Sequence, residues 1–218
     1  MNRQTLVAVQ VGLPQTRQEG DLLDDREYEW KSGIYKEPIA GHVWVGKLNL
    51  TGDGQADLLH HGGPDRPILA YSADHYAFWQ DVLGRPELPF GMFGENFTVS
   101  GAHEDSVCLG DVYQVGDAVI EVSQPRIPCW KLGRRTGSAD VPARAATTGR
   151  TGWYLRVLHE GHVTSGQTLT LVERPWPDWS ITRAHQVYRG RRLDRYAALA
   201  LAGCQALSTD WRRVLTET

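Results

Sequence analysis

Gln124-Pro-Arg-Ile-Pro-Cys-Trp-Lys131 is the most informative stretch of this 218-residue chain. It places Cys129 after two prolines and before a tryptophan, with Arg126 and Lys131 close on either side. Fixed cations favour an ionised thiolate, and rigid neighbours hold its direction. The stretch is therefore typical of a reactive or metal-bound cysteine. The alternative is a buried structural cysteine, because free cysteine is among the most buried residue types.

Two blocks upstream combine glycines with hydrogen-bond donors. One is His60-His-Gly-Gly-Pro-Asp-Arg66, and the other is Gly91-Met-Phe-Gly-Glu-Asn-Phe-Thr98. Glycine lets backbone N–H groups converge on an anion, and Arg, His, Asn and Thr side chains add donors that suit phosphate or carboxylate. Both blocks therefore indicate a cradle for an anionic ligand.

Taken in this order, the three blocks resemble the MOSC domains, which are named for the C-terminal domain of molybdenum cofactor sulfurase, and among them the YiiM type. The resemblance covers residues 30–172. Its further segments are Trp30-Lys-Ser-Gly-Ile-Tyr-Lys-Glu-Pro38, Gly52-Asp-Gly-Gln-Ala-Asp57, Gly110-Asp111 and Gly152-Trp-Tyr-Leu-Arg-Val157. The resemblance implies an α+β, mainly β fold, in which a MOSC-type β-barrel-like domain precedes a small three-helix C-terminal appendage.

The same resemblance implies a function. The barrel would hold the molybdenum cofactor, a pterin-dithiolene molybdenum group, with Cys129 as the catalytic residue and the protein ligand to the metal. Relatives of this type reduce N-hydroxylated compounds, so the leading hypothesis is a molybdenum-dependent reductase of small molecules such as hydroxylaminopurine. Two alternatives stay open, namely a sulfur (persulfide) or cofactor carrier without turnover, and a binding module without redox chemistry.

The candidate cofactor-binding residues follow from the chemistry of that group. A soft thiolate suits the metal, and the cofactor's phosphate carries about two negative charges near neutral pH. The candidates for the phosphate are Ser32, Lys36, Gly62, Gly63, Arg66, Asn96 and Arg126. The candidates for the donor- and acceptor-rich pterin edge are His60, His61, Glu95 and Thr98. Gly94 completes the set.

Several candidates also have a structural interpretation. His60 and His61 are adjacent, so on a strand they would face opposite sides and at most one would enter the site. Arg126 could instead form an ion pair with Asp111 or Glu121.

In the second glycine block, Glu95 and Asn96 could close their own turn by bonds from side chain to backbone. We expect Asp53 and Asp57, which also match the family pattern, to form turns.

Composition places few limits on function. No apolar run approaches the roughly 18 residues of a membrane span, and the first residues lack the apolar stretch of a signal peptide, so we expect a cytoplasmic protein. The three cysteines form no Cys-x-x-Cys pair, which argues against a disulfide framework, a structural zinc site and a four-cysteine cluster. We expect Cys108 and Cys204 to be core thiols.

The charge is uneven along the chain. Residues 1–180 hold 16 Lys and Arg against 23 Asp and Glu, a net of −7, whereas residues 181–218 hold 7 against 3, a net of +4. The basic tail could dock an acidic protein, although its arginines could simply be solvated. No aromatic-interleaved basic stripe supports nucleic-acid binding. A homo-oligomer is compatible with the sequence.

The reductase hypothesis requires an external electron donor. The chain has no Gly-x-Gly-x-x-Gly after a strand, no four-cysteine cluster and no haem-attachment motif. A separate flavoprotein or iron–sulfur protein would have to supply the electrons, and we expect NADH or NADPH alone to fail.

Hydrophobic patterning and turn residues predict the order of elements. Strands are expected at 43–50, 112–115, 118–123, 153–158 and 168–172, with hairpins at Gly116-Asp117 and after residue 158. A helix is expected from Ser72 to a stop at Gly84, and lid-like or surface loops at 12–29 and 137–150.

The C-terminal part is expected to be helical. Residues 1–172 would form the MOSC domain, 173–180 a Pro- and Trp-rich linker, and 181–218 the three-helix segment. Ser180, Asp194 and Ser208 would cap the three helices, with Gly190 and Gly203 as stops. Helices this short must pack on the barrel or on each other.

Overall fold

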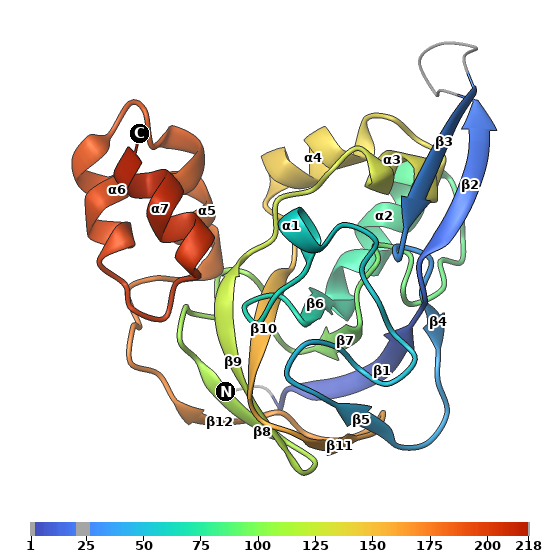
Figure 1. The fold of residues 1–218 in the computed structure, drawn as a ribbon, viewed down its shortest axis with the longest axis horizontal. Coiled ribbons are helices and arrows are strands. Elements are labelled where there is room, and N and C mark those ends of the chain that lie inside the picture. Colours follow the sequence, from blue (N-terminus) through green and yellow to red (C-terminus); the bar gives the residue numbers. More distant parts are fainter. Residues whose placement is uncertain (1–2, 21–26, 218) are drawn as a thin grey trace.

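A computed structural model describes residues 3–20 and 27–217 and shows a curled mixed sheet with helices above it and a helical C-terminal segment at its side (Figure 1). The strands are β1 Thr5–Val11, β2 Gln15–Gly20, β3 Glu27–Ser32, β4 Glu37–Pro38, β5 Val43–Val45, β6 Ile68–Ser72, β7 Phe97–Ser100, β8 Val112–Val115, β9 Ala118–Pro125, β10 Trp153–His159, β11 Gly161–Val163 and β12 Thr170–Glu173. The helices are α1 Leu58–His61, η1 Ala73–His75, α2 Tyr76–Leu83, α3 Lys131–Thr136, α4 Val141–Thr148, α5 Ile181–Gly190, α6 Arg195–Ala202 and α7 Thr209–Glu217.

Eight strands form one sheet in the order β12-β8-β9-β10-β6-β7-β1-β4. β6 pairs with β7 in parallel, and the other neighbours are antiparallel. β5 pairs with β11, and β2 with β3. This half-barrel with added helices confirms the predicted α+β, mainly β fold class.

The strand predictions are mostly confirmed, with one error in length and one in pairing. The strand expected at 43–50 is limited to β5, because the chain turns after it, where Gly46 N donates to Asn49 O at 2.9 Å. β8 and β9 form the expected hairpin, and Gly116 at its turn has φ 53°. The second expected hairpin is wrong, because β12 pairs with β8 and not with β10. Both edges of β10 are already used, by β9 and by β6, so the chain after it must return to another edge of the sheet.

Both expected loops contain regular structure. The sequence predicts a loop at 12–29, but β2 and β3 pair in register from Gln15↔Ser32 to Gly20↔Glu27. Residues 21–26 lie outside the described part of the chain. The prediction for 137–150 is wrong as well, because α4 occupies most of it. Pro142 lies in the first turn of α4, where proline is tolerated, and Gly149 ends the helix with φ 75°.

The predicted helices are confirmed together with their caps. The Ser72 hydroxyl accepts from Asp74 N at the start of η1, which leads into α2, and Gly84 ends α2 in the left-handed region. The longest described helix, α5, has 10 residues. Among residues 3–20 and 27–217, no helix is long and apolar enough to cross a membrane.

The caps of the C-terminal segment agree equally well. The side chains of Ser180, Asp194 and Ser208 accept bonds from backbone N–H groups at 3.2, 2.9 and 3.3 Å, respectively. Gly203 is the C-cap of α6, whereas α5 continues through Gly190 to a cap at Arg191. Three short helices therefore form where the sequence predicts them.

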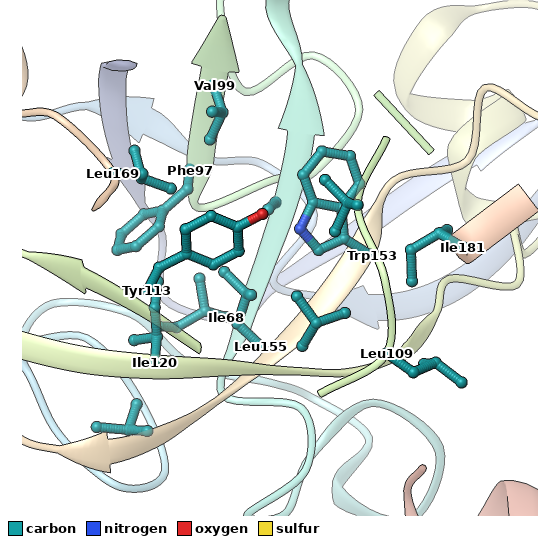
Figure 2. Close-up of a cluster of buried hydrophobic side chains, with 14 of the residues drawn as sticks. Ile68, Phe97, Val99, Leu109, Tyr113, Ile120, Trp153, Leu155, Leu169 and Ile181 are labelled. Atoms are coloured by element: carbon teal, nitrogen blue, oxygen red, sulfur yellow. The ribbon is translucent and has the colours of Figure 1, made fainter. Parts of the chain in front are cut away.

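One hydrophobic core joins the sheet to the C-terminal helices. Phe97, Tyr113 and Trp153, from β7, β8 and β10, point toward one another in its centre (Figure 2). Leu201 of α6 and Trp211 of α7 belong to the same cluster. The helices are thus stabilised by packing against the sheet, as their short lengths require.

A buried ion pair anchors the segment between β12 and α5. The Asp111 side chain is fully buried and accepts from Arg174 Nε at 2.7 Å and Nη2 at 2.6 Å. Cys108 N and the Tyr113 hydroxyl donate to the same carboxylate. The predicted linker is therefore fastened to the barrel through this pair.

We expect Arg174→Ala to lower the free energy of unfolding by about 3 kcal/mol, because it leaves the buried Asp111 carboxylate without its cation. Urea denaturation measures this. The matched control is Arg144→Ala, which removes an exposed pair with Asp140 in α4 and should cost less than about 0.5 kcal/mol. Equal losses in the two variants would contradict the role of the Asp111 pair.

Candidate functional site

A pocket opens where the end of β3, helix α1, strand β10 and the segment between β9 and α3 meet. Its enclosed volume is about 80 Å³, and the hollow reaches about 630 Å³ only when the space open to solvent is included. Its lining residues are Ser32, Gly33, Ile34, Lys36, Gly54, Gln55, Ala56, Asp57, His61, Arg66, Leu69, Gly94, Asn96, Arg126, Ile127, Cys129, Lys131 and Tyr154. The pocket thus collects residues from all three sequence blocks.

Cys129 lies in the pocket wall and is partly exposed. It lies in the segment between the end of β9 at Pro125 and the start of α3 at Lys131. Arg126 N donates to Gly152 O at 3.1 Å, which continues the pairing with β10 by one bond. Lys131 Nζ donates to Lys31 O at 2.9 Å and ties the start of α3 to β3. The segment that carries the thiol is therefore held at both ends.

Arg126 is the cation best placed for an anionic ligand. It is only 5 % exposed, it lines the pocket, and its guanidinium has no hydrogen-bond or ion-pair partner in the described part of the chain. The two acids that could have paired with it have other partners, since Asp111 pairs with Arg174 and Glu121 with Arg156. Its nitrogens are not sealed from solvent, so the guanidinium opens on the pocket and can receive an anion from outside.

Lys36, unlike Arg126, has an ion-pair partner. It forms a buried ion pair with Asp53, which also accepts from Gly12 N and from Asn96 Nδ2, both at 2.9 Å. Burial lowers the pKa of Lys36, and Asp53 opposes that shift. Asn96 in turn accepts from Leu69 N at 3.1 Å. Lys36 and Asn96 line the pocket, and both also bind the buried Asp53 carboxylate.

Two candidates in the second glycine block have structural partners. The Glu95 carboxylate accepts from Gly91 N at 2.9 Å, from Phe93 N at 3.1 Å, and from the hydroxyls of Tyr76 and Thr98. Glu95 and Thr98 are fully buried and lie outside the pocket lining. Glu95 therefore stabilises its own turn through bonds to the backbone, which is the structural alternative to ligand binding. Gly94, in contrast, lines the pocket.

The first glycine block forms a short helix and a turn. Asp57 caps α1 and accepts from His60 N, while the His60 ring is exposed and bonds to Asp57 Oδ2 at 2.9 Å. The two histidines lie on α1 and not on a strand, and of the two only His61 lines the pocket. Gly62 and Gly63 lie outside the lining.

The pocket is electropositive. The pKa of His61 is lowered to about 4, first by burial and then by the nearby charges of Lys131 and Arg126, with a smaller effect of Arg66. His61 is therefore neutral at pH 7. Three cations that act on one imidazole make a site that favours an anion.

Tyr154 is a pocket residue that the sequence prediction missed. Burial raises its pKa, and the charges of Arg126 and Arg66 oppose that rise, so the hydroxyl is protonated at neutral pH. The signal was available, because neighbours on a strand face opposite sides. Trp153 points into the core, so Tyr154 must face the other way, toward Cys129.

Comparison with known proteins gives the same assignment. Residues 57–170 match the MOSC domain family. The YflK protein of Bacillus subtilis is 40 % identical over 210 residues, which is 96 % of this chain and 92 % of that protein. The YiiM protein of Escherichia coli is 34 % identical over 186 residues, with 84 % and 83 % covered.

A third relative is named a reductase. This protein of Gibberella moniliformis is 39 % identical over 168 residues, or 76 % of this chain, and that match spans only 30 % of the fungal protein. Among solved structures, YiiM from Geobacillus stearothermophilus superposes with a TM-score of 0.79 at 35 % identity and 98 % coverage of both chains. The chain therefore belongs to the MOSC domain family and is of the YiiM type.

Proposed function

We propose that this protein is a molybdenum-cofactor-binding reductase of N-hydroxylated compounds, with Cys129 as the protein ligand to molybdenum. The observation that carries the proposal is that the Cys129 thiol shares one pocket with the unpaired buried cation Arg126. The family and the reductase name of one relative support the same class of activity.

The charges of the pocket fit the proposed cofactor. Its phosphate carries about two negative charges near neutral pH, and Arg126, Lys131 and Arg66 supply matching cations. Lys36 and Arg66 contribute less net charge, because Asp53 and Asp210 offset them. The Cys129 thiolate would be the soft ligand from the protein, while the dithiolene sulfurs arrive with the cofactor.

The proposed reaction is R–NHOH + 2 e⁻ + 2 H⁺ → R–NH₂ + H₂O. The bound cofactor would supply the two-electron chemistry that breaks the N–O bond. The protein would supply binding, orientation and protons. Tyr154 is our candidate proton donor, because its protonated hydroxyl lines the pocket near Cys129 and has no hydrogen-bond partner among the described residues.

The two electrons would come from a separate flavoprotein or iron–sulfur protein. The basic C-terminal segment is a candidate landing surface for an acidic carrier. Leu193, in the turn between α5 and α6, and Tyr196, in the first turn of α6, are 94 % and 89 % exposed. Several other arginines of the segment are occupied internally: Arg189 and Arg195, for example, donate to backbone carbonyls.

Cys129→Ala should abolish reduction of hydroxylaminopurine and remove molybdenum, because the only protein bond to the metal is lost. Metal per chain is measured by elemental analysis after expression in cells that make the cofactor. Cys108→Ala and Cys204→Ala are matched controls, since both thiols are buried in the core. They should keep the metal and lose about 1 to 2 kcal/mol of stability. Full activity of Cys129→Ala would refute the ligand assignment.

Arg126→Ala and Lys36→Ala should differ. Loss of Arg126 should weaken cofactor binding about tenfold or more and leave the stability of the apo protein nearly unchanged. Loss of Lys36 strips the buried Asp53 of its cation and should lower apo stability by about 3 kcal/mol. Molybdenum content and urea denaturation test both. Full metal content in Arg126→Ala would mean that the phosphate binds elsewhere.

Tyr154→Phe should slow turnover by about 100-fold, because a positioned proton donor contributes at least that much. Its molybdenum content should match that of the wild type, since the ring and its packing remain. Turnover is measured with a dye reductant, so that docking of an electron carrier does not limit the rate. Unchanged turnover would remove Tyr154 from the proton pathway.

A further inference from the structure

The turn that carries Arg66 is fastened to the first residues of α7. Thr209 N donates to Asp65 Oδ2 at 3.2 Å, and Arg156 pairs with Asp65 Oδ1 at 2.8 Å. The Ser123 hydroxyl of β9 donates to Asp65 O at 2.6 Å, while Ser208 N donates to Ser123 O at 3.0 Å. The turn, β9 and the start of α7 therefore form one hydrogen-bonded unit.

The Arg66 side chain forms hydrogen bonds on two sides, to α7 and to the chain at and after α1. Its Nη2 donates to Asp210 Oδ2 of α7 at 2.6 Å and to Leu59 O of α1 at 3.3 Å. Its Nε donates to Gly62 O at 3.1 Å. The remaining nitrogen, Nη1, has no partner among the described residues, and Arg66 is part of the pocket lining.

We infer that Asp210 is a positioning residue, through which the C-terminal helical segment completes the anion-binding pocket. The inference rests on the proposed function, because it names how Arg66 is aimed at the cofactor's phosphate. An arginine side chain loses up to about 2 kcal/mol of rotamer entropy when it is ordered. Asp210 orders Arg66 before the ligand arrives, so less entropy is lost on binding.

Asp210 also has an opposite effect on the pocket, which makes the inference testable. Its negative charge offsets part of the Arg66 charge and should weaken the attraction of an anion. Asp210→Asn removes the charge but keeps an oxygen that accepts from Arg66, whereas Asp210→Ala removes both. Positioning predicts that Asp210→Ala binds an anion more weakly than Asp210→Asn. A counter-charge alone predicts that both variants bind more tightly than the wild type.

The experiment uses apo protein from cells that cannot make the cofactor, with inorganic phosphate as the probe in calorimetry. We expect Asp210→Ala to weaken phosphate binding about three- to tenfold and Asp210→Asn to bind at least as tightly as the wild type. Hydrogen exchange of backbone amides 59–66 should accelerate in Asp210→Ala. Arg213→Ala is the control, because it removes an exposed pair with Glu217 on the same helix and should change neither quantity.

Three outcomes would overturn the inference: phosphate binding by Asp210→Ala as tight as that of the wild type, unchanged exchange at 59–66, or no phosphate binding by the wild type. Failure of the proposed function looks different. In that case the wild type binds phosphate with the expected order of variants, yet acquires no molybdenum in cells that make the cofactor.

Discussion

The antiparallel pairing of β9 with β10 is the constraint on which the site depends. The two strands are in register at Trp153↔Pro125 and Tyr154↔Gln124, and one more bond, from Arg126 N to Gly152 O, continues the pairing past the end of β9. Strand alternation then fixes what each face presents. Trp153 enters the core, Tyr154 faces the pocket, and the chain beyond Pro125 delivers Arg126 and Cys129 beside it.

Several buried charges of the molecule have a partner of opposite charge, whereas Arg126 in the pocket has none among the described residues. Asp53 is paired with Lys36, Asp111 with Arg174, and Glu104 with His75. Arg126 is as deeply buried as these groups and has no such partner in the described ranges. Local rules of polar satisfaction are broken mainly at functional sites. The unpaired guanidinium therefore supports the proposal that the pocket binds an anion, independently of the cysteine.

Elements that depend on local chemistry could be predicted from the sequence. Predictions were wrong where the outcome depends on the position of a residue within an element or on the pairing of strands far apart in sequence. Caps such as Ser180 and Asp194 act within one turn, so their pattern was sufficient. Pro142 and Gly149 were interpreted as loop residues, although a proline at the start and a glycine at the end are also compatible with a helix. The pairing of β12 with β8 joins residues far apart in sequence. Likewise, the sequence predicts that Glu95 contacts the pterin, whereas in the structure its carboxylate accepts hydrogen bonds from Gly91 N and Phe93 N.

The cation-rich pocket also has a consequence for the apo protein. Arg126, Lys131 and Arg66 are close enough to depress the pKa of His61 together, so they must also repel one another. An anionic ligand that binds only the folded state removes this repulsion and stabilises the fold by an amount that grows with its concentration. Stability lost to this repulsion is therefore regained on binding. The fold and the ligand are coupled through the same three side chains, and the neutral state of His61 keeps a fourth charge out of the pocket.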